Sequence, residues 1–441
     1  MATGALNLPS DPVTSQPPWL LAEVVGFFFS LRIFCTVLAV RVFQQDAQVG
    51  VAVSLALNFL LLAIVVFHSL GPARRTIASI FRLPGGTLVL IFLGFSGCSL
   101  TWTAAVSRSA AAAFWLAMVA DLGMVVLLLR TGPILATGAA VVKGYVCGAC
   151  CVAVMAWLMP NLSDLRLGDE ELLGPNQIGY ACAFAIFLAQ FLILMRNQGR
   201  WRFSITFLAI TLLRSLSKTT IVAFVAGETV LMVLDRSMSR KTKVMLILAA
   251  ALVIAAFWGL LAAYYDNYIN SGNGAVTLTG RFGIWTVILD QAVEQPWFGH
   301  GFHSVWKVIP PFGLFEARHA HNELLQQFYA YGVAGVFMMI ALYTSFYRHV
   351  KKLSASPLKA LMFSFLVFVL VRGLADTEPF DLSLPLWAMI LFSAIMNEIR
   401  ADHDVKGTPP ATLPFEIEHA QAIPPVGELP LPNPGRSFGL S

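Results

Sequence analysis

Residues 264–327 form the longest polar interval of the chain and contain four of its eight histidines. Within this interval, His319 and His321 stand two residues apart, and Arg281 lies between a glycine and a phenylalanine. A guanidinium group binds phosphate oxygens through paired hydrogen bonds and stays charged at any relevant pH. An imidazole titrates near neutrality and can accept a proton from a hydroxyl. These residue types predict a site that binds a phosphorylated lipid through Arg281 and moves a proton through His321.

Further candidates for substrate binding come from neighbouring loops and from the same interval. They are Arg214, Lys218, His319, Asn322 and Arg372. Arg214 and Lys218 flank a serine-rich turn, and both stay open as the second phosphate ligand. Arg372 begins a loop that also carries Asp376, Glu378 and Asp381. That loop fits sugar binding, and it fits salt bridges within the loop equally well.

Other kinds of chemistry have weaker support. His300, His303, His319 and His321 could form a metal site, but no cysteine and few carboxylates accompany them. Gly299-His300-Gly301 is too short for a nucleotide-binding fingerprint, and the sequence has no Gly-x-Ser-x-Gly elbow. The six cysteines lie inside apolar runs, where packing explains them. We therefore expect no metal and no cofactor.

The composition is that of an integral membrane protein. Of 441 residues, 57% are hydrophobic and 12% are charged, whereas a soluble domain carries roughly 25% charged residues. The net charge of +5 could suggest nucleic-acid binding. The basic residues, however, lie in short loops between apolar runs, as the positive-inside rule describes. Membrane lipids are therefore expected partners, and nucleic acid is not.

The apolar runs predict an all-α polytopic membrane bundle, because the lipid core admits only helices or closed barrels. About 20 apolar residues cross a bilayer. On that criterion about twelve transmembrane helices are predicted, at 19–40, 47–67, 86–106, 109–129, 133–158, 177–195, 203–214, 218–234, 243–263, 328–347, 358–374 and 383–399.

The same reading divides the chain into five parts. Nine spans occupy 19–263, and a catalytic loop with short amphipathic helices occupies 264–327. Three further spans occupy 328–400, and residues 1–18 and 401–441 are expected to be disordered cytoplasmic tails.

Loop charge predicts the orientation of these spans. With a cytoplasmic N-terminus, fifteen Lys and Arg residues fall in inner loops and six in short outer loops, as the positive-inside rule requires. The interval 264–327 then lies on the outer side. Arg41, Arg108 and Arg166 share that side, where contacts with lipid headgroups explain them.

Charged residues are also predicted within spans, among them Arg32, Asp121, Lys143 and Glu228. Such charges mark either internal pairing or a transport path, and pairing is favoured here. A transporter is the competing function from another class, which broken helices at matching positions in two halves would support. The sequence offers one candidate break, at 214–218, and no counterpart. A structural scaffold for polysaccharide assembly is a third interpretation, but it leaves the His-Asn motif without a purpose.

Several spaced motifs resemble the bacterial O-antigen ligase and polysaccharide polymerase family. They are Gly280-Arg281-Phe282-x-Ile284-Trp285, Pro296-x-x-Gly299-x-Gly301, and His319-x-His321-Asn322-x-x-Leu325-Gln326 followed by Gly332 and Gly335. The turn at 215–219 and the stretch 174–179 are also similar to family features. The resemblance covers about residues 170–395. Residues 297–306 look most like the exopolysaccharide polymerase branch.

The resemblance implies a metal-independent glycosyltransferase of the bacterial inner membrane with a periplasmic active loop. Its donor would be a glycan on undecaprenyl diphosphate, and its acceptor a sugar hydroxyl. His321 would be the base, and Arg281, with Arg214 or Lys218, would hold the diphosphate. Polysaccharide assembly proteins are further expected partners. Polymerisation of O-antigen or exopolysaccharide is the first expectation, and ligation to lipid A core is the alternative.

Overall fold

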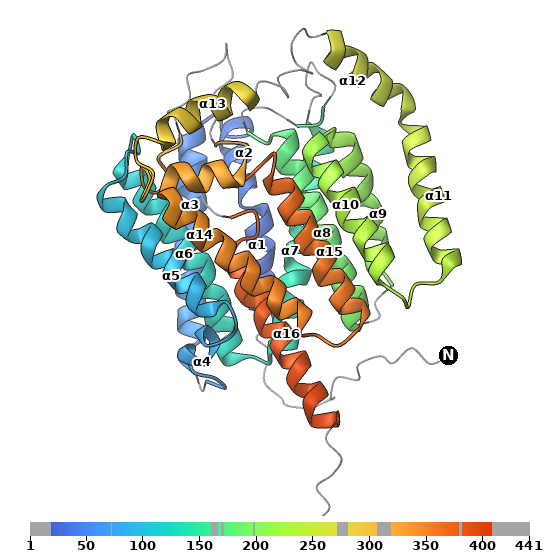
Figure 1. Cartoon of the computed structure of the whole chain (residues 1–441), viewed down its shortest axis with the longest axis horizontal. Coiled ribbons are helices and arrows are strands. Elements are labelled where there is room, and N and C mark those ends of the chain that lie inside the picture. The colour runs from blue at the N-terminus through green and yellow to red at the C-terminus, as the bar shows by residue number, and fades with distance from the viewer. Residues whose placement is uncertain are drawn as a thin grey trace, which may run out of the picture. The chain divides into compact units, whose positions relative to one another are not determined.

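The computed structural model describes residues 19–71, 73–159, 166–168, 172–196, 199–270, 281–306, 319–378 and 382–407. All regular elements in these ranges are helices, as predicted (Figure 1). In chain order they are α1 (Trp19–Leu31), α2 (Ile33–Arg41), α3 (Ala47–His68), α4 (Ile77–Phe81), α5 (Gly86–Cys98), η1 (Ser99–Thr101), α6 (Arg108–Thr131), α7 (Ile134–Leu158), α8 (Pro175–Arg196), α9 (Trp201–Ser215), α10 (Lys218–Leu234), α11 (Arg240–Ala256), α12 (Trp258–Asn270), α13 (Arg281–Ala292), α14 (Glu323–Lys351), α15 (Pro357–Gly373) and α16 (Leu386–Gly407).

The apolar helices are those of a multi-pass membrane protein. Among the described residues, five helices are long and apolar enough to cross a bilayer: α3, α6, α7, α8 and α14. The pair α1 and α2, bent by 58°, makes a sixth if it forms one span. Each of the twelve predicted segments overlaps a helix. Several of these helices are shorter than a bilayer requires, so twelve crossings stay a prediction.

The predicted tails fall largely outside the described residues. Residues 1–18 and 408–441 are not described, whereas 401–407 continue α16 as helix. The unit that ends at Arg400 contains all the other described elements. The catalytic loop predicted at 264–327 is described at 264–270, which belong to α12, at 281–306 and from 319 onward.

Small residues allow α1 and α7 to pack backbone against backbone. A Cβ on Gly26 would lie 1.9 Å from the carbonyl oxygen of Val141, and one on Gly144 would lie 1.9 Å from that of Glu23. Within lipid, the hydrophobic effect does not drive helices to associate. Close van der Waals contact of this kind holds membrane helices together instead. The crossing of α1 and α7 therefore anchors the N-terminal helix in the bundle.

The charges predicted within spans have partners in the structure. Arg32 binds Asp121 at 2.6 Å, and Lys143 binds Glu23 at 2.6 Å. The Glu228 carboxylate accepts a hydrogen bond of 2.8 Å from Gln190. Pairing satisfies charges that would be costly in lipid. These contacts support internal pairing over a transport path.

Helix α14 contains a sharp kink at Gly332, whose φ is 64°. A loop segment lies against the kink, because the amides of Val333 and Ala334 donate to the carbonyls of Pro296 (2.7 Å) and Trp297 (3.2 Å). A Cβ at position 332 would meet the backbone of Trp297 at 2.4 Å, so glycine is required there. The kink separates a short first segment, 323–331, from the remainder of α14. This first segment carries the functional motif at its N-terminus.

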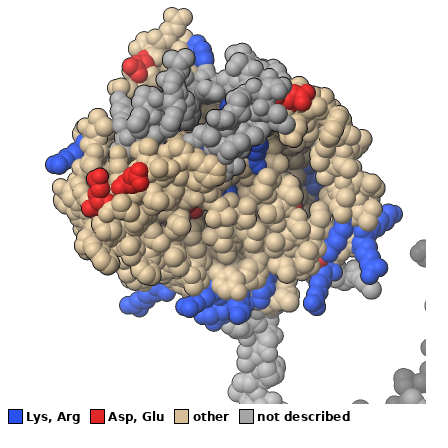
Figure 2. Space-filling view, turned by 45° about the horizontal axis from the view of Figure 1, so that its top comes forward, with Lys and Arg blue, Asp and Glu red and all other residues tan. Residues whose placement is uncertain are grey.

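Basic side chains concentrate at one end of the bundle. Figure 2 shows Lys and Arg gathered along the lower edge of the view. The α4 end of the bundle lies at the bottom of Figure 1, and α13 lies at the top. This asymmetry is the one that the positive-inside rule describes. It agrees with the predicted placement of 264–327 on the side away from the basic loops.

Candidate functional site

The candidate site forms where the start of α14 meets the connection between α15 and α16. Asn322 is the N-cap of α14, and its side-chain oxygen accepts a 3.0 Å hydrogen bond from the amide of Leu325. Its side-chain nitrogen donates to the carbonyl of Leu374 at 2.8 Å. Asn322 therefore starts the helix and also fastens it to the loop that follows α15. Substrate contact by Asn322 stays a prediction, while its capping role is observed.

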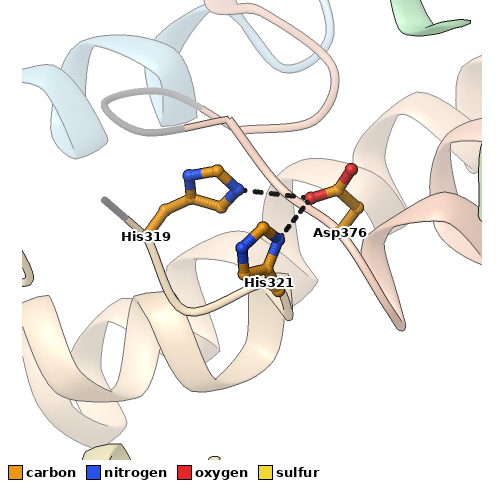
Figure 3. A group of neighbouring side chains, drawn as sticks. All are labelled: His319, His321 and Asp376. Atoms are coloured by element: carbon orange, nitrogen blue, oxygen red, sulfur yellow. Dashed lines mark hydrogen bonds and ion pairs between the residues drawn. The ribbon is translucent and has the colours of Figure 1, made fainter. Parts of the chain in front are cut away.

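His319 and His321 converge on one carboxylate oxygen (Figure 3). Nδ1 of His321 lies 3.0 Å from Oδ1 of Asp376, and Nε2 of His319 lies 3.3 Å from the same atom. The Asp376 side chain is 1% exposed, so this carboxylate is within the protein. His321 has a φ of 51°, a left-handed conformation that non-glycine residues rarely adopt. Backbone strain of this kind is concentrated at functional sites.

The contact with Asp376 determines which nitrogen of His321 can act as a base. An ionised carboxylate only accepts hydrogen bonds, so the nitrogen facing it must carry the proton. His321 therefore holds its proton on Nδ1, and Nε2 is the basic nitrogen. The arrangement is that of a base oriented by a carboxylate, as in hydrolase triads. Asp376 acts here as a positioning residue.

Electrostatics keep the two partners in complementary states. Burial lowers the pKa of His321 to about 4, with further lowering from His319 and Arg281, and Asp376 acts in the opposite direction. Burial raises the pKa of Asp376, but Arg372 and the hydrogen bonds from both histidines outweigh it and hold that pKa well below its usual range. At neutral pH the carboxylate is ionised and the imidazole of His321 is neutral. A neutral imidazole can accept a proton.

Arg372 lies beside the Asp376 carboxylate, inside the protein, and is 2% exposed. Its guanidinium is 3.5 Å from Oδ2 of Asp376 and 3.0 Å from Oε1 of Glu378, and it stacks 4.1 Å from the centre of the Tyr180 ring. Of the two roles left open by the sequence, these contacts are those of salt bridging within the loop. Asp381 lies outside the described residues. Arg372 holds Asp376 in place, and substrate contact by Arg372 stays a prediction.

A second carboxylate ties the start of α14 to the same region. Oε1 of Glu323 accepts hydrogen bonds from the Tyr343 hydroxyl at 2.7 Å and from the Ser383 amide at 2.9 Å. Glu323 is also packed against Gly373, where a Cβ would lie 2.5 Å from Oε2. The two residues that follow His321, Asn322 and Glu323, are thus both fastened by hydrogen bonds, which fixes the position of the histidine.

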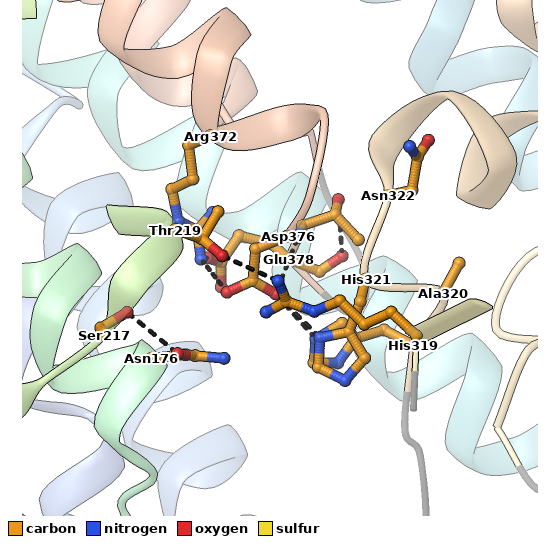
Figure 4. Close-up of polar contacts among 12 residues, drawn as sticks. Asn176, Ser217, Thr219, His319, Ala320, His321, Asn322, Arg372, Asp376 and Glu378 are labelled. Carbon is orange, nitrogen blue, oxygen red and sulfur yellow. Dashed lines mark hydrogen bonds and ion pairs between the residues drawn. The ribbon is translucent and has the colours of Figure 1, made fainter. Parts of the chain in front are cut away.

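The predicted phosphate ligands lie at the start of α13 and around the turn between α9 and α10, of which Figure 4 shows Ser217 and Thr219. Arg281, the first residue of α13, donates to the hydroxyl of Thr219 at 2.8 Å. The preceding Lys218 is exposed, and Arg214 is half-buried at the end of α9. Arg281 is close enough to His321 to affect its pKa. The structure therefore brings Arg281 and this turn to the histidine motif, with Arg214 and Lys218 both still open.

The turn between α9 and α10 has a defined conformation, held by hydrogen bonds. Leu216 adopts a left-handed φ of 53°, and the hydroxyl of Ser217 donates to the side-chain oxygen of Asn176 at 2.9 Å. This bond joins the start of α8 to the start of α10. It explains why the stretch 174–179 and the turn 215–219 occur together in the motif set.

Sequence reasoning missed two contributors. Asp376 was named only as a neighbour of Arg372, and Thr219 only as part of a turn. The signal for Asp376 was an acidic residue four positions after an arginine at the end of an apolar run. That spacing alone does not connect the carboxylate to a histidine motif 55 residues away.

Three of the described side chains could in principle hold a metal ion. One ligand atom from each of His319, His321 and Asp376 lies within 4.8 Å of the others. The guanidinium of Arg372 beside Asp376 and the positive charge of Arg281 both oppose a cation here. His300 and His303, the other candidates for a metal site, lie elsewhere, stacked on Tyr329 and Phe114 respectively. The distances from both histidines to Asp376 are those of hydrogen bonds.

Comparison with known proteins agrees with this geometry. Residues 203–340 match a family model described as O-antigen ligase. This segment is thus similar to the O-antigen ligase family over about a third of the chain. It contains the predicted site residues Arg214, Lys218, Arg281, His319, His321 and Asn322, whereas the predicted Arg372 lies outside it. The family resemblance inferred from the motifs is thereby confirmed.

One curated relative is the O-antigen ligase of Pseudomonas aeruginosa, which is 32% identical over 97 residues. The aligned stretch covers 22% of this chain and 24% of the relative. The chain thus matches about a quarter of that protein's length. The apolar helices are those of a multi-pass membrane protein, and the similarity to the O-antigen ligase family agrees with this.

Proposed function

We propose that this protein transfers a glycan from an undecaprenyl-diphosphate-linked donor to a sugar hydroxyl at the periplasmic face of the inner membrane. The observation that carries this proposal is the oriented base, His321 on Asp376, next to Arg281. A hydroxyl acceptor needs a base, and a departing diphosphate needs positive charge. The site supplies both at the start of one helix.

The reaction follows from these roles. Nε2 of His321 takes the proton of the acceptor hydroxyl as its oxygen attacks the anomeric carbon of the donor. The bond from that carbon to the diphosphate oxygen breaks, and undecaprenyl diphosphate leaves with the electron pair. Arg281, with Arg214 or Lys218, stabilises the charge that grows on the leaving group. The guanidinium supplies what a divalent cation would otherwise supply, so the reaction is proposed to be metal-independent.

Two acceptors are consistent with this chemistry. The motif at 297–306 favours polymerisation, in which the acceptor is a sugar of a second lipid-linked glycan. The two comparisons, both described as O-antigen ligase, favour ligation to lipid A core. We propose polymerisation as the main function and ligation as the alternative. The partners of Asp121, Lys143 and Glu228 within the protein weaken the main argument for a transporter.

The deciding experiment uses the purified full-length protein in detergent with an undecaprenyl-diphosphate-linked oligosaccharide. Donor alone is expected to give longer lipid-linked glycans and free undecaprenyl diphosphate. Addition of lipid A core instead tests ligation. Incubation with EDTA is expected to leave the rate unchanged, with metal content measured in parallel. Absence of glycan transfer to either acceptor, by protein that retains its melting temperature, would contradict the proposed function.

The pH dependence of the reaction provides an independent check on the base. A free histidine loses its ability to accept a proton as the pH falls through about 6.5. The pKa of His321 is lowered to about 4, so the neutral, active form persists further into the acid range. We expect kcat/KM to stay nearly constant from pH 7.5 to about 5.5 and to fall below pH 5. A fall in kcat/KM with a midpoint near pH 6.5 would contradict the buried, neutral state of His321.

A further inference from the structure

A pocket of about 420 Å³ lies at the opposite end of the bundle from the candidate site. It is lined by Ala73, Arg74, Arg75, Thr76, Ile77 and Arg130. These residues belong to the segment before α4, the start of α4 and the end of α6. Figure 1 shows α4 at the bottom of the bundle and α13, which carries Arg281, at the top. The pocket is thus far from the proposed chemistry and plays no part in it.

Main-chain hydrogen bonds hold the three arginines together. The amides of Arg74 and Arg75 donate to the carbonyl of Arg130 at 3.0 and 3.2 Å. The guanidinium of Arg130 donates in turn to the carbonyl of Ser69 at 3.3 Å. The three arginines therefore line one pocket because of main-chain hydrogen bonds, which do not depend on a ligand. Such preorganisation lowers the entropic cost of binding.

The pocket keeps an excess of positive charge and of hydrogen-bond donors. Glu398 on α16 is 3.1 Å from the guanidinium of Arg75 and compensates one of the three charges. Arg75 also donates to the carbonyl of Gly132 at 3.3 Å. A guanidinium has five N–H donors, so these contacts leave capacity on each arginine. Arginine forks match phosphate oxygens in geometry and charge.

Exposed apolar side chains lie next to these arginines in the chain. Phe67 is 78% exposed and Leu70 is 74% exposed, on either side of His68 and Ser69. Ile77, which lines the pocket, is 44% exposed. Apolar surface beside a binding site contributes nothing to the binding of a small soluble anion. It does contribute to the binding of a phospholipid, whose acyl chains lie next to its phosphate.

We propose that this pocket binds the phosphate of an anionic phospholipid headgroup, with Phe67, Leu70 and Ile77 lying along the acyl chains. Basic pockets between membrane helices on the cytoplasmic side suit such headgroups. The bound lipid joins α3, α4 and α6 at the end of the bundle where the arginines gather. The proposal does not depend on the enzymatic reaction, and it can fail or succeed separately.

The test measures lipid retention by native mass spectrometry on purified full-length protein. The probes are phosphatidylglycerol, phosphatidylcholine and inorganic phosphate. Each basic residue near a membrane surface is worth about fivefold in affinity. We therefore expect Arg74→Gln to weaken phosphatidylglycerol binding about fivefold, and Arg74→Gln with Arg130→Gln about 25-fold. The matched control, Arg82→Gln with Arg240→Gln, removes the same charge outside the pocket and should leave binding unchanged.

Three outcomes would overturn the proposal. The first is equal loss of phosphatidylglycerol in the pocket and control variants, which would mean that net charge alone acts. The second is equal binding of phosphatidylcholine and phosphatidylglycerol. The third is displacement of the lipid by inorganic phosphate at equal concentration, which would make this a site for free phosphate. Arg74 is exposed and its side chain has no role in the fold described here, so the single variant guards against misfolding.

Discussion

Replacement of His321 by alanine is expected to lower the rate of glycan transfer by about 100-fold or more, the usual contribution of general acid–base catalysis. The loss should appear in kcat, because Nε2 of His321 acts on the acceptor hydroxyl in the transition state. Binding of the lipid-linked donor should change little, since arginine holds the diphosphate. The measurement is a steady-state assay of purified protein with a lipid-linked donor, together with donor affinity in the absence of acceptor.

A second variant separates chemistry from folding. His321 has a left-handed backbone with φ of 51°, which an alanine tolerates less well than an asparagine. His321→Asn therefore keeps the backbone and removes the basic nitrogen. Both variants should be inactive, and the Asn variant should retain a melting temperature near that of the native protein. His319→Ala is the matched control and should lose less activity. Full turnover by a well-folded His321→Asn protein would rule out His321 as the base.

The features that could be predicted from the sequence are those encoded locally. Apolar runs gave the helices because their length and composition depend on adjacent residues. His321 and Arg281 were found because each stands in a short, polar, glycine- and aromatic-rich motif. The cap that Asn322 forms on α14 is also local, because its side chain accepts a hydrogen bond from the amide of Leu325, three residues further on.

The partnerships across the site could not be predicted, because they depend on how distant helices meet. Asp376 contacts His321 across 55 residues of chain, and Thr219 contacts Arg281 across 62. Arg372 illustrates the same limit. Its charge suggested a surface ligand, but its position at the end of α15 places it beneath Asp376 with only 2% exposure. Burial of an arginine is decided by its neighbours in space, which composition does not reveal.

The kink in α14 also depends on residues that are distant in the sequence. The apolar pattern predicted one unbroken span over 328–347, whereas the helix that contains it bends at Gly332. The bend depends on the carbonyls of Pro296 and Trp297, which accept hydrogen bonds from the amides beyond it. A glycine in an apolar run does not by itself indicate that a loop is packed against it. Because of the bend, residues 323–331 follow a different axis from the rest of α14. The position of His321, just before this segment, depends on that axis.

Arg281→Lys is expected to impair glycan transfer almost as severely as Arg281→Ala, with a loss of about 100-fold or more for each, the usual effect of removing one charge-stabilising donor. Lysine keeps the positive charge but presents a point charge on a flexible chain, whereas the guanidinium offers a planar fork. The 2.8 Å hydrogen bond to Thr219 uses one end of that fork and orients the rest. The variants should be compared in kcat and in donor KM with the same lipid-linked substrate.

Two further variants make this prediction sharper. Thr219→Val keeps the shape of the side chain and removes the hydroxyl that accepts from Arg281, so it should cause a smaller loss than Arg281→Lys. Arg240→Lys, at the start of α11, serves as the matched control and should be as active as the native protein. If charge alone matters, Arg281→Lys will retain near-normal turnover and Thr219→Val will have no effect. That result would show that the diphosphate is not held by a fork, and that Arg281 acts only through its field on the leaving group and on His321.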